Sequence, residues 1–117
     1  MNDQELLELS AKAAGLELDW DVPDGASPWL ITGVGVDRGP ATPWNPLDDD
    51  GDAFRLMVAL SLDVAFDGDH CVQIDYFGSD GELYVVEQLV LGDPADAVRR
   101  VIVRTAAEIE MGKSLTC

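Results

Sequence analysis

The stretch HCVQIDYFGSDGELYVVEQLVL, residues 70–91, decides the fold class, because it predicts two antiparallel strands joined by a tight turn. Residues 70–77 alternate apolar and polar side chains, a pattern typical of a half-buried strand. The tetrapeptide GSDG at 78–81 predicts the turn, since Asp-Gly supplies the positive φ angles that a tight hairpin requires. Residues 82–91 are rich in Val and Leu and predict the returning strand.

The length of the turn predicts which side chains of this hairpin are buried together. With a turn of two or four residues, one face combines alternate residues of both strands, most of them apolar: Val72, Ile74, Tyr76, Leu83, Val85, Glu87 and Leu89. We expect this face to be buried, and we expect the opposite face to be mixed in character.

A helix is predicted directly after the hairpin. Asp93 is placed as its N-cap, and Pro94 occupies the first helical position, where the missing N–H group is tolerated. Apolar residues then recur at helical spacing from Val98 to Ile109, which predicts a buried stripe. Gly112 predicts the end of this helix.

The stretch WNPLDDDGDAFRLMVAL, residues 44–60, could begin a helix or form a metal or catalytic cluster. An EF-hand loop with Gly51 at its sixth position would place Pro46 and Met57 at the first and twelfth, where neither donates a carboxylate. Carboxylates at a helix N-terminus accept hydrogen bonds from free N–H groups and face the positive end of the dipole. We therefore predict a helix over about 49–62, and a looser Ca²⁺ or Mg²⁺ site remains the alternative.

The N-terminal half completes the element order. Its first residues predict a helix that Asn2 or Asp3 caps and Gly15 ends. Short strands are predicted at 16–20 and, with a bulge, at 29–36. The resulting order is α-β-β-α-β-β-α. It predicts an α+β fold in which a four-stranded, mainly antiparallel sheet packs against three helices in one domain of 117 residues.

The charge of the chain predicts its class of partner. There are 23 acidic residues and 7 basic ones, which gives a formal net charge of −16. Such a field repels DNA, RNA and anionic membrane surfaces, and it attracts basic protein surfaces. The alternative is that the acids only keep the protein in solution. No signal peptide or membrane-spanning segment is predicted, and Cys71 and Cys117 are expected to be thiols in a reducing cytoplasm.

The sequence predicts no catalytic residue, metal site or cofactor. His70 and Cys71 are adjacent on a strand, so their side chains point to opposite faces and cannot form a nucleophilic pair. One His and two Cys are fewer than the four ligands of a structural zinc site. The glycines in GVGVDRG, residues 33–39, lack the spacing of a phosphate loop and are predicted to form a bulge or turn.

Tryptophans and clustered acids are the candidate residues for binding a protein. Trp is enriched in interface hot spots, and all three tryptophans border loops. The predicted contact residues are Trp20, Trp29, Trp44, Asp48, Asp49, Asp50, Asp52, Asp75, Asp80 and Glu82. Mimicry of a phosphate backbone would require these acids to lie on one face. The alternative is that the tryptophans belong to the core.

Three stretches resemble a known family: ELLELSAKAAGLE near the start, WNPLDDDGDAFRLMVAL in the middle and ADAVRRVIVRTAAEIEMGK near the end. They are similar to small proteins of phages and prophages that share an ELLELAAKAAG-like helix and a WNPL-x-DDGDALRL motif. Residues 44–47 and 49–53 match this motif, Asp48 lies at its variable position, and Phe54 replaces the usual Leu. The resemblance implies an α-β-α sandwich. It implies no functional residue, because the family has no assigned activity.

Together, the resemblance and the charge predict a non-enzymatic phage or prophage accessory protein in the bacterial cytoplasm. We expect it to bind a host or phage protein with a basic surface, and not nucleic acid or membrane directly. A sharper version is an inhibitor of a nucleic-acid-binding defence protein, such as a CRISPR interference complex, that acts by acidic-surface mimicry. The alternatives are a phage structural or assembly protein and a small metal-dependent hydrolase. The oligomeric state is left open.

Overall fold

A computed structural model describes residues 2–23, 26–32 and 42–115. The predicted α+β class is confirmed, since these residues form both helices and strands. The helices of this part of the chain are α1 (Asp3–Ala13), α2 (Asp50–Leu60) and α3 (Pro94–Leu115).

The strands belong to two separate antiparallel sheets. The first, sheet A, contains β1 (Glu17–Asp19), β2 (Trp29–Thr32) and β3 (Thr42–Pro43) in that order. The second, sheet B, contains β4 (Asp63–Asp67), β5 (Cys71–Phe77) and β6 (Leu83–Leu89) in that order.

The prediction of one four-stranded sheet is wrong. The two N-terminal strands pair with each other and with β3, while the hairpin gains β4 as a third strand. Strand β4 was not predicted: it lies between the helix expected over about 49–62 and the strand expected at 70–77. Helix α2 ends in the left-handed conformation at Ser61, with φ of 55°, and the chain then turns directly into β4. The predicted strand residues 33–36 lie outside the described part.

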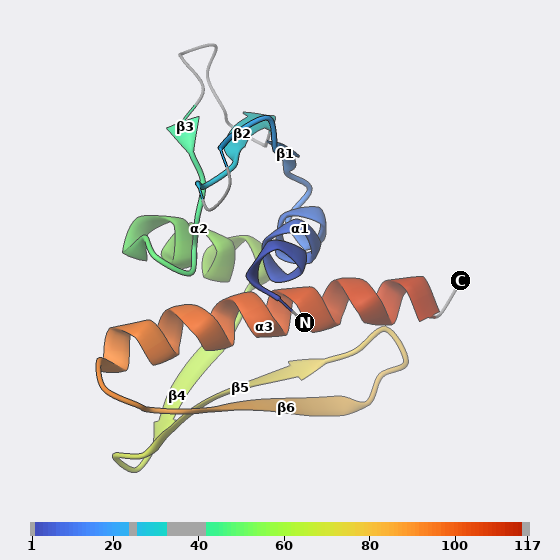
Figure 1. The fold of residues 1–117 in the computed structure, drawn as a ribbon. Helices are drawn as coiled ribbons and strands as arrows, with labels where there is room; N and C mark the ends of the chain where they lie inside the picture. Colours follow the sequence, from blue (N-terminus) through green and yellow to red (C-terminus); the bar gives the residue numbers. More distant parts are fainter. Residues whose placement is uncertain (1, 24–25, 33–41, 116–117) are drawn as a thin grey trace.

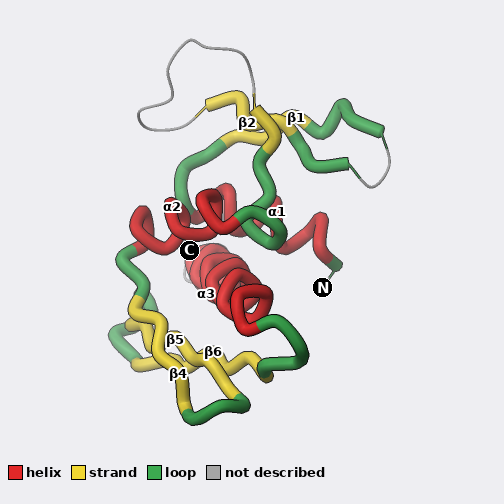
Figure 2. Tube along the Cα trace, turned by 90° about the vertical axis from the view of Figure 1, so that its left-hand side faces the viewer, coloured by secondary structure: helices red, strands yellow, loops and turns green. Residues whose placement is uncertain are grey.

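The three helices lie between the two sheets. Figure 1 shows α3 with α1 and α2 on one side and sheet B on the other, and sheet A lies beyond α1 and α2. The view in Figure 2, turned by 90°, shows the same order of layers. The expected α-β-α sandwich has a sheet between helices, so the observed order is the reverse of that expectation.

Helix α3 is the centre of the core. Its consecutive residues Val101, Ile102 and Val103 are all buried. Successive residues point about 100° apart around a helix, so burial of three in a row means that α3 is covered on several sides. Thr105 is also fully buried, and its hydroxyl donates a hydrogen bond to the carbonyl of Val101 at 2.7 Å. The fold therefore depends on one helix that contacts both neighbouring layers.

The predicted N-caps are confirmed. The side chain of Asn2 accepts a hydrogen bond from the Glu5 amide at 2.8 Å, and Asp93 accepts one from the Ala95 amide at 3.1 Å. The predicted end of the last helix is wrong, because Gly112 lies inside α3. A single glycine costs only about 1 kcal/mol in a helix interior, which a long packed helix tolerates.

The predicted faces of the hairpin are also wrong. Phe77 pairs with Leu83, so the loop between the paired residues has five residues, 78–82, and an odd length reverses the parity of the second strand. The pairing places Tyr84 opposite Tyr76 and Val86 opposite Ile74, on the face that packs against α3. Consequently the apolar residues expected inside on β6 lie on the other face of sheet B.

Candidate functional site

The acids at the start of α2, the α2 acidic cluster (Asp48, Asp49, Asp50 and Asp52), are mostly engaged in the fold. Asp49 is the N-cap of α2, and its carboxylate accepts a hydrogen bond from the Asp52 amide at 2.8 Å. The carboxylate of Asp52 is buried and accepts from the Asn45 amide at 3.0 Å and from Arg55 at 2.8 Å. This arrangement confirms the helix-start interpretation of the sequence.

Arg99 of α3 ties this cluster to the central helix. Its guanidinium donates to the carboxylate of Asp50 at 2.6 Å and to the carbonyl of Leu47 at 3.0 Å. The hydrogen bond with Asp50 raises the pKa of Arg99 above its usual value. Within the described ranges, no three His, Cys, Asp or Glu side chains are grouped so that they could hold a metal ion.

The tryptophans do not form a shared surface. Trp44 is only 4% exposed, and its amide donates to the carbonyl of Pro28 at 2.9 Å. Trp20 is partly buried against the core, whereas Trp29 on β2 is 39% exposed. Trp44 and Asp52, two of the predicted contact residues, are both buried as part of the fold.

Sheet B presents an uncovered apolar face to solvent. The pairing of its strands places these residues on the side away from α3, here named the outer face: Asp63, Ala65, Asp67, Cys71, Gln73, Asp75, Phe77, Leu83, Val85, Glu87 and Leu89. Its large apolar side chains are unusually accessible, with Phe77 at 75%, Leu89 at 61% and Leu83 at 54%. Cys71 is a free thiol. Cys117, which was also expected to be a thiol, lies outside the described residues.

Carboxylates are interspersed with these apolar side chains. Asp63 lies directly opposite Asp75 in the register of β4 and β5. Directly opposed side chains of an antiparallel pair have Cβ atoms about 4.5–5.5 Å apart, so two like charges there are destabilising. Glu87 and Asp67 add two further acids to the same face. The outer face therefore combines exposed apolar area with unfavourable negative charge.

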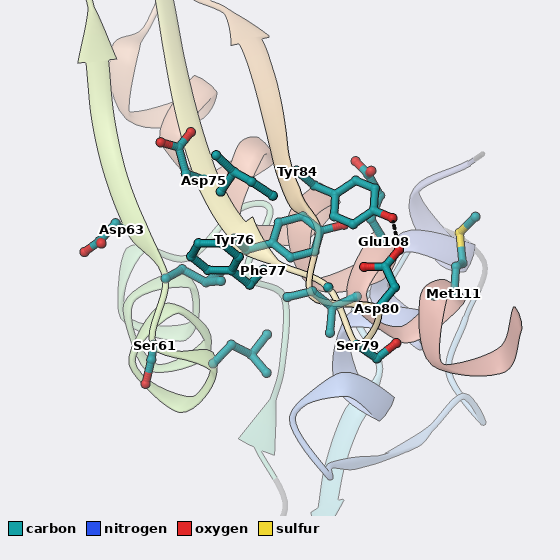
Figure 3. A pocket seen from close by; sticks show the side chains of 16 residues that line it. Ser61, Asp63, Asp75, Tyr76, Phe77, Ser79, Asp80, Tyr84, Glu108 and Met111 are labelled. Atoms are coloured by element: carbon teal, nitrogen blue, oxygen red, sulfur yellow. Dashed lines mark hydrogen bonds between the residues drawn. The ribbon is translucent and has the colours of Figure 1, made fainter. Parts of the chain in front are cut away.

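A cavity of about 960 Å³, the hairpin pocket, opens at one end of sheet B. The β5–β6 hairpin, the end of α2 and the last turns of α3 line it, as Figure 3 shows. Four of its described lining residues are acidic and none is basic: Asp63, Asp75, Asp80 and Glu108. The pocket therefore has a strongly negative wall.

Two tyrosines form the aromatic part of the hairpin pocket. The rings of Tyr76 and Tyr84 stack with their centroids 5.4 Å apart and their planes 21° apart. The Tyr84 hydroxyl donates a hydrogen bond to the carboxylate of Asp80 at 2.5 Å, and the amide of Glu82 donates to the other oxygen at 2.9 Å. A Cβ atom on Gly78 would lie 2.6 Å from the Tyr84 ring, so a glycine at this position leaves room for the ring.

These contacts change the pKa values of the three groups in the expected directions. The hydrogen bond from Tyr84, followed by that from the Glu82 amide, lowers the pKa of Asp80. The same bond with Asp80 raises the pKa of Tyr84. Burial raises the pKa of Tyr76, and the negative charges of Glu108 and Asp80 raise it further. At neutral pH the pocket therefore holds an ionised carboxylate beside two neutral phenols.

Comparison with known proteins adds no relative. No family model, curated protein or solved structure matches this chain. The resemblance to phage and prophage proteins therefore stays a prediction. Among the residues that the structure describes, no helix is long and apolar enough to cross a membrane.

The predicted contact residues lie in separate regions. Asp75 and Asp80 line the hairpin pocket with Glu82 nearby, whereas Asp50 contacts Arg99 near the start of α3. Arg99 and the pocket residue Glu108 are nine residues apart, about 14 Å along the helix axis. The predicted acids are therefore divided between two places along α3.

Sequence reasoning missed the residues that give the site its aromatic and apolar character. They come together through the register of the hairpin: Tyr76, Phe77, Leu83, Tyr84, Val85 and Leu89. The packing of α3 adds the carboxylate of Glu108, which was also missed. The length of the turn is the feature of the sequence that could have revealed the apolar residues among them. A loop of five residues would have placed Leu83, Val85 and Leu89 on the outer face.

Proposed function

We propose that this chain is a non-enzymatic acidic protein that binds a basic protein through the outer face of sheet B. The exposure of Phe77, Leu83 and Leu89 on one sheet face is the observation that carries the proposal. Large exposed apolar patches on soluble proteins mark interaction surfaces. Covering them would remove apolar area from water, which stabilises a complex by about 25 cal/mol per Å² before the costs of association.

The charge of the same face favours a basic partner. The opposed carboxylates of Asp63 and Asp75 would gain from a Lys or Arg side chain placed between them, since a cation offsets their repulsion. A second copy of this chain is a poor occupant, because each copy has a formal net charge of −16. Complementary charge also speeds association with a basic surface and rejects acidic ones.

The more specific proposal is a phage or prophage accessory protein of the bacterial cytoplasm. Its partner would be a host nucleic-acid-binding defence protein, such as a CRISPR interference complex, whose basic groove accepts carboxylates in place of phosphates. The support for this version is the charge of the chain and the carboxylates of the outer face. The carboxylates of the α2 acidic cluster add less support, because most of them form hydrogen bonds within the fold.

A pull-down from bacterial lysate at low and high salt tests the proposal. The matched variants are Leu83→Ser with Leu89→Ser on the outer face, and Phe54→Ser with Val58→Ser on exposed positions of α2. We expect the native chain and the α2 variant to retain the same basic protein, and the outer-face variant to lose it. High salt should weaken retention, because it screens exposed charges.

Two results would contradict the proposal. If the variant with both outer-face substitutions still retains the basic protein, the contact must lie elsewhere on the molecule. A chain that retains nothing but forms stable oligomers through Leu83 and Leu89, seen by light scattering, would favour the alternative of a structural or assembly protein.

A further inference from the structure

The hairpin pocket combines an aromatic surface with carboxylates, and its described lining residues include no Lys or Arg. Tyr84 is 40% exposed and stacks on the more buried Tyr76, so the pair presents a supported aromatic surface. An aromatic face attracts a cation placed within about 6 Å of the ring centre. The first requirement of a site for an organic cation is therefore present.

The carboxylate of Asp80 is held in place before any ligand arrives. Tyr84 and the Glu82 amide bond to its two oxygens, and both bonds favour the ionised form. Each carboxylate oxygen still has a lone pair for a further donor. Because the carboxylate is fixed and charged in the free protein, it is a preorganised acceptor for a cation. Binding therefore requires little further loss of side-chain entropy at Asp80.

Glu108 supplies a second carboxylate on the same side of the pocket. Figure 3 shows Glu108 and Asp80 near Tyr84, while Asp63 lies on the opposite side. The carboxylate of Glu108 is exposed and forms no hydrogen bond or ion pair with a described residue.

The arginines of α3 are engaged elsewhere. Arg99 binds Asp50, and Arg100 lies 3.5 Å from Asp3. Arg104 donates to the carbonyl of Glu87 and to the side chain of Gln88, both at 2.8 Å. None of these three guanidinium groups forms an ion pair with a carboxylate among the described lining residues of the pocket, so a cationic ligand would find these acceptors available.

We infer that the hairpin pocket binds a guanidinium group, supplied by an arginine side chain of the basic partner. This inference rests on the proposed function, since the arginine belongs to that partner. A guanidinium is planar and stacks on a tyrosine ring while its edge donates to carboxylates such as Asp80 and Glu108. The cavity of about 960 Å³ exceeds the size of this group, which leaves room for the arginine stem and its peptide backbone.

The test uses small probes of matched shape. N-acetyl-arginine methylamide and N-acetyl-citrulline methylamide differ in charge and not in size, and the corresponding lysine compound supplies an ammonium. Binding is followed by NMR of the ¹⁵N-labelled chain. We expect the arginine probe to shift the amides of Tyr76, Tyr84 and Glu108, and the citrulline probe to bind about tenfold more weakly. The lysine probe should fall between them.

Substitutions then locate the site. Tyr84→Leu removes the aromatic surface and should weaken arginine binding about tenfold, and Glu108→Gln should weaken it about two- to fivefold. The matched control is Asp69→Asn, which removes one exposed charge in the turn between β4 and β5, at the other end of sheet B, and should leave binding unchanged. Amide spectra of each variant report whether the fold is retained.

Equal binding of citrulline and arginine would overturn the inference, as would equal effects of Glu108→Gln and Asp69→Asn. If the outer face retains a basic partner but the arginine probe does not bind the pocket, the inference fails and the proposed function stands. If the probe binds but no basic partner is retained, the guanidinium chemistry is supported, and a free small molecule replaces the partner as its source.

Discussion

The two acidic regions of this protein are similar in composition and different in role. In the α2 acidic cluster, the carboxylates of Asp49, Asp50 and Asp52 bind a helix terminus, Arg99 and Arg55. Around the hairpin pocket, Asp80 is held by its own hairpin, and Glu108 has no described partner. In this protein, the acids that are consecutive in the sequence stabilise the fold locally, whereas acids that are far apart in the sequence come together around the pocket.

The comparison predicts that substitutions in the first region cost stability, and that substitutions in the second change ionisation and binding. The largest expected effect is that of Asp52→Ala. It leaves the Asn45 amide and Arg55 without their acceptor, and the loss of partly buried hydrogen bonds to a charged group costs about 2 kcal/mol. Urea unfolding followed by Trp fluorescence measures this change in the free energy of unfolding.

Glu108→Ala is the control for that experiment. The side chain is exposed and has no described hydrogen bond, so the free energy of unfolding should change by less than about 0.5 kcal/mol. A loss of stability as large as that of Asp52→Ala would mean that the two regions do not differ in role.

A smaller effect is expected for Asp49→Ala. Removal of this N-cap should lower the free energy of unfolding by about 1 kcal/mol, because the Asp52 amide loses its acceptor. Asp48→Ala removes an exposed neighbour with the same charge and should be nearly neutral. Chemical unfolding of both variants tests whether position rather than charge decides the cost.

A third effect is local to the pocket and is expected for Gly78→Ala. The new Cβ atom would meet the Tyr84 ring at 2.6 Å, so the ring must move and its hydrogen bond with Asp80 must weaken. We expect the NMR signals of Tyr84 and Asp80 to shift while signals from α1 and α2 keep their positions. An unchanged Tyr84 environment would show that the hairpin adapts instead.

The smallest effects concern pH. The raised pKa of Tyr84 means that its hydrogen bond contributes stability below pH 10.0, which is lost as the pH rises through the folded pKa. The lowered pKa of Asp80 means that its contribution is present above pH 3.8 and is lost as the pH falls through the folded pKa.

Ultraviolet absorbance of the tyrosines provides the measurement. In Asp80→Asn, the pKa of Tyr84 should fall toward 10.0, because the charged acceptor of its hydrogen bond is gone. Asp63→Asn removes another acid of the pocket that is not among the causes of the Tyr84 shift, and should leave this titration unchanged. Equal shifts in the two variants would assign the effect to net charge alone.

Local features of the fold were predictable from the sequence. The caps at Asn2, Asp49 and Asp93 depend on residues within a few positions of one another, and all three helices begin where the sequence predicts. The end of α3 was not predictable in this way, because packing along the helix tolerates Gly112.

The sheets and the site depend on contacts that a local pattern does not specify. The strands at β1 and β2 were predicted, but which strands share a sheet depends on how the helices separate them. Asp75 and Asp80, two of the predicted contact residues, both line the pocket. Glu108 reaches the same pocket from a helix that begins after both strands, so only the packed fold brings it there.

The central position of α3 has a consequence for how the chain is made. Helix α3 follows every other described element in the sequence, and it is the helix that packs against both α1 and sheet B. Arg100 and Asp3, for example, meet across 97 positions. Contacts between such distant segments slow folding.

On the ribosome, chains grow by about 5–20 residues per second, so the apolar faces of α1, α2 and sheet B remain uncovered until α3 has been synthesised. The acidic residues that precede α3 then repel neighbouring nascent chains before any partner is met.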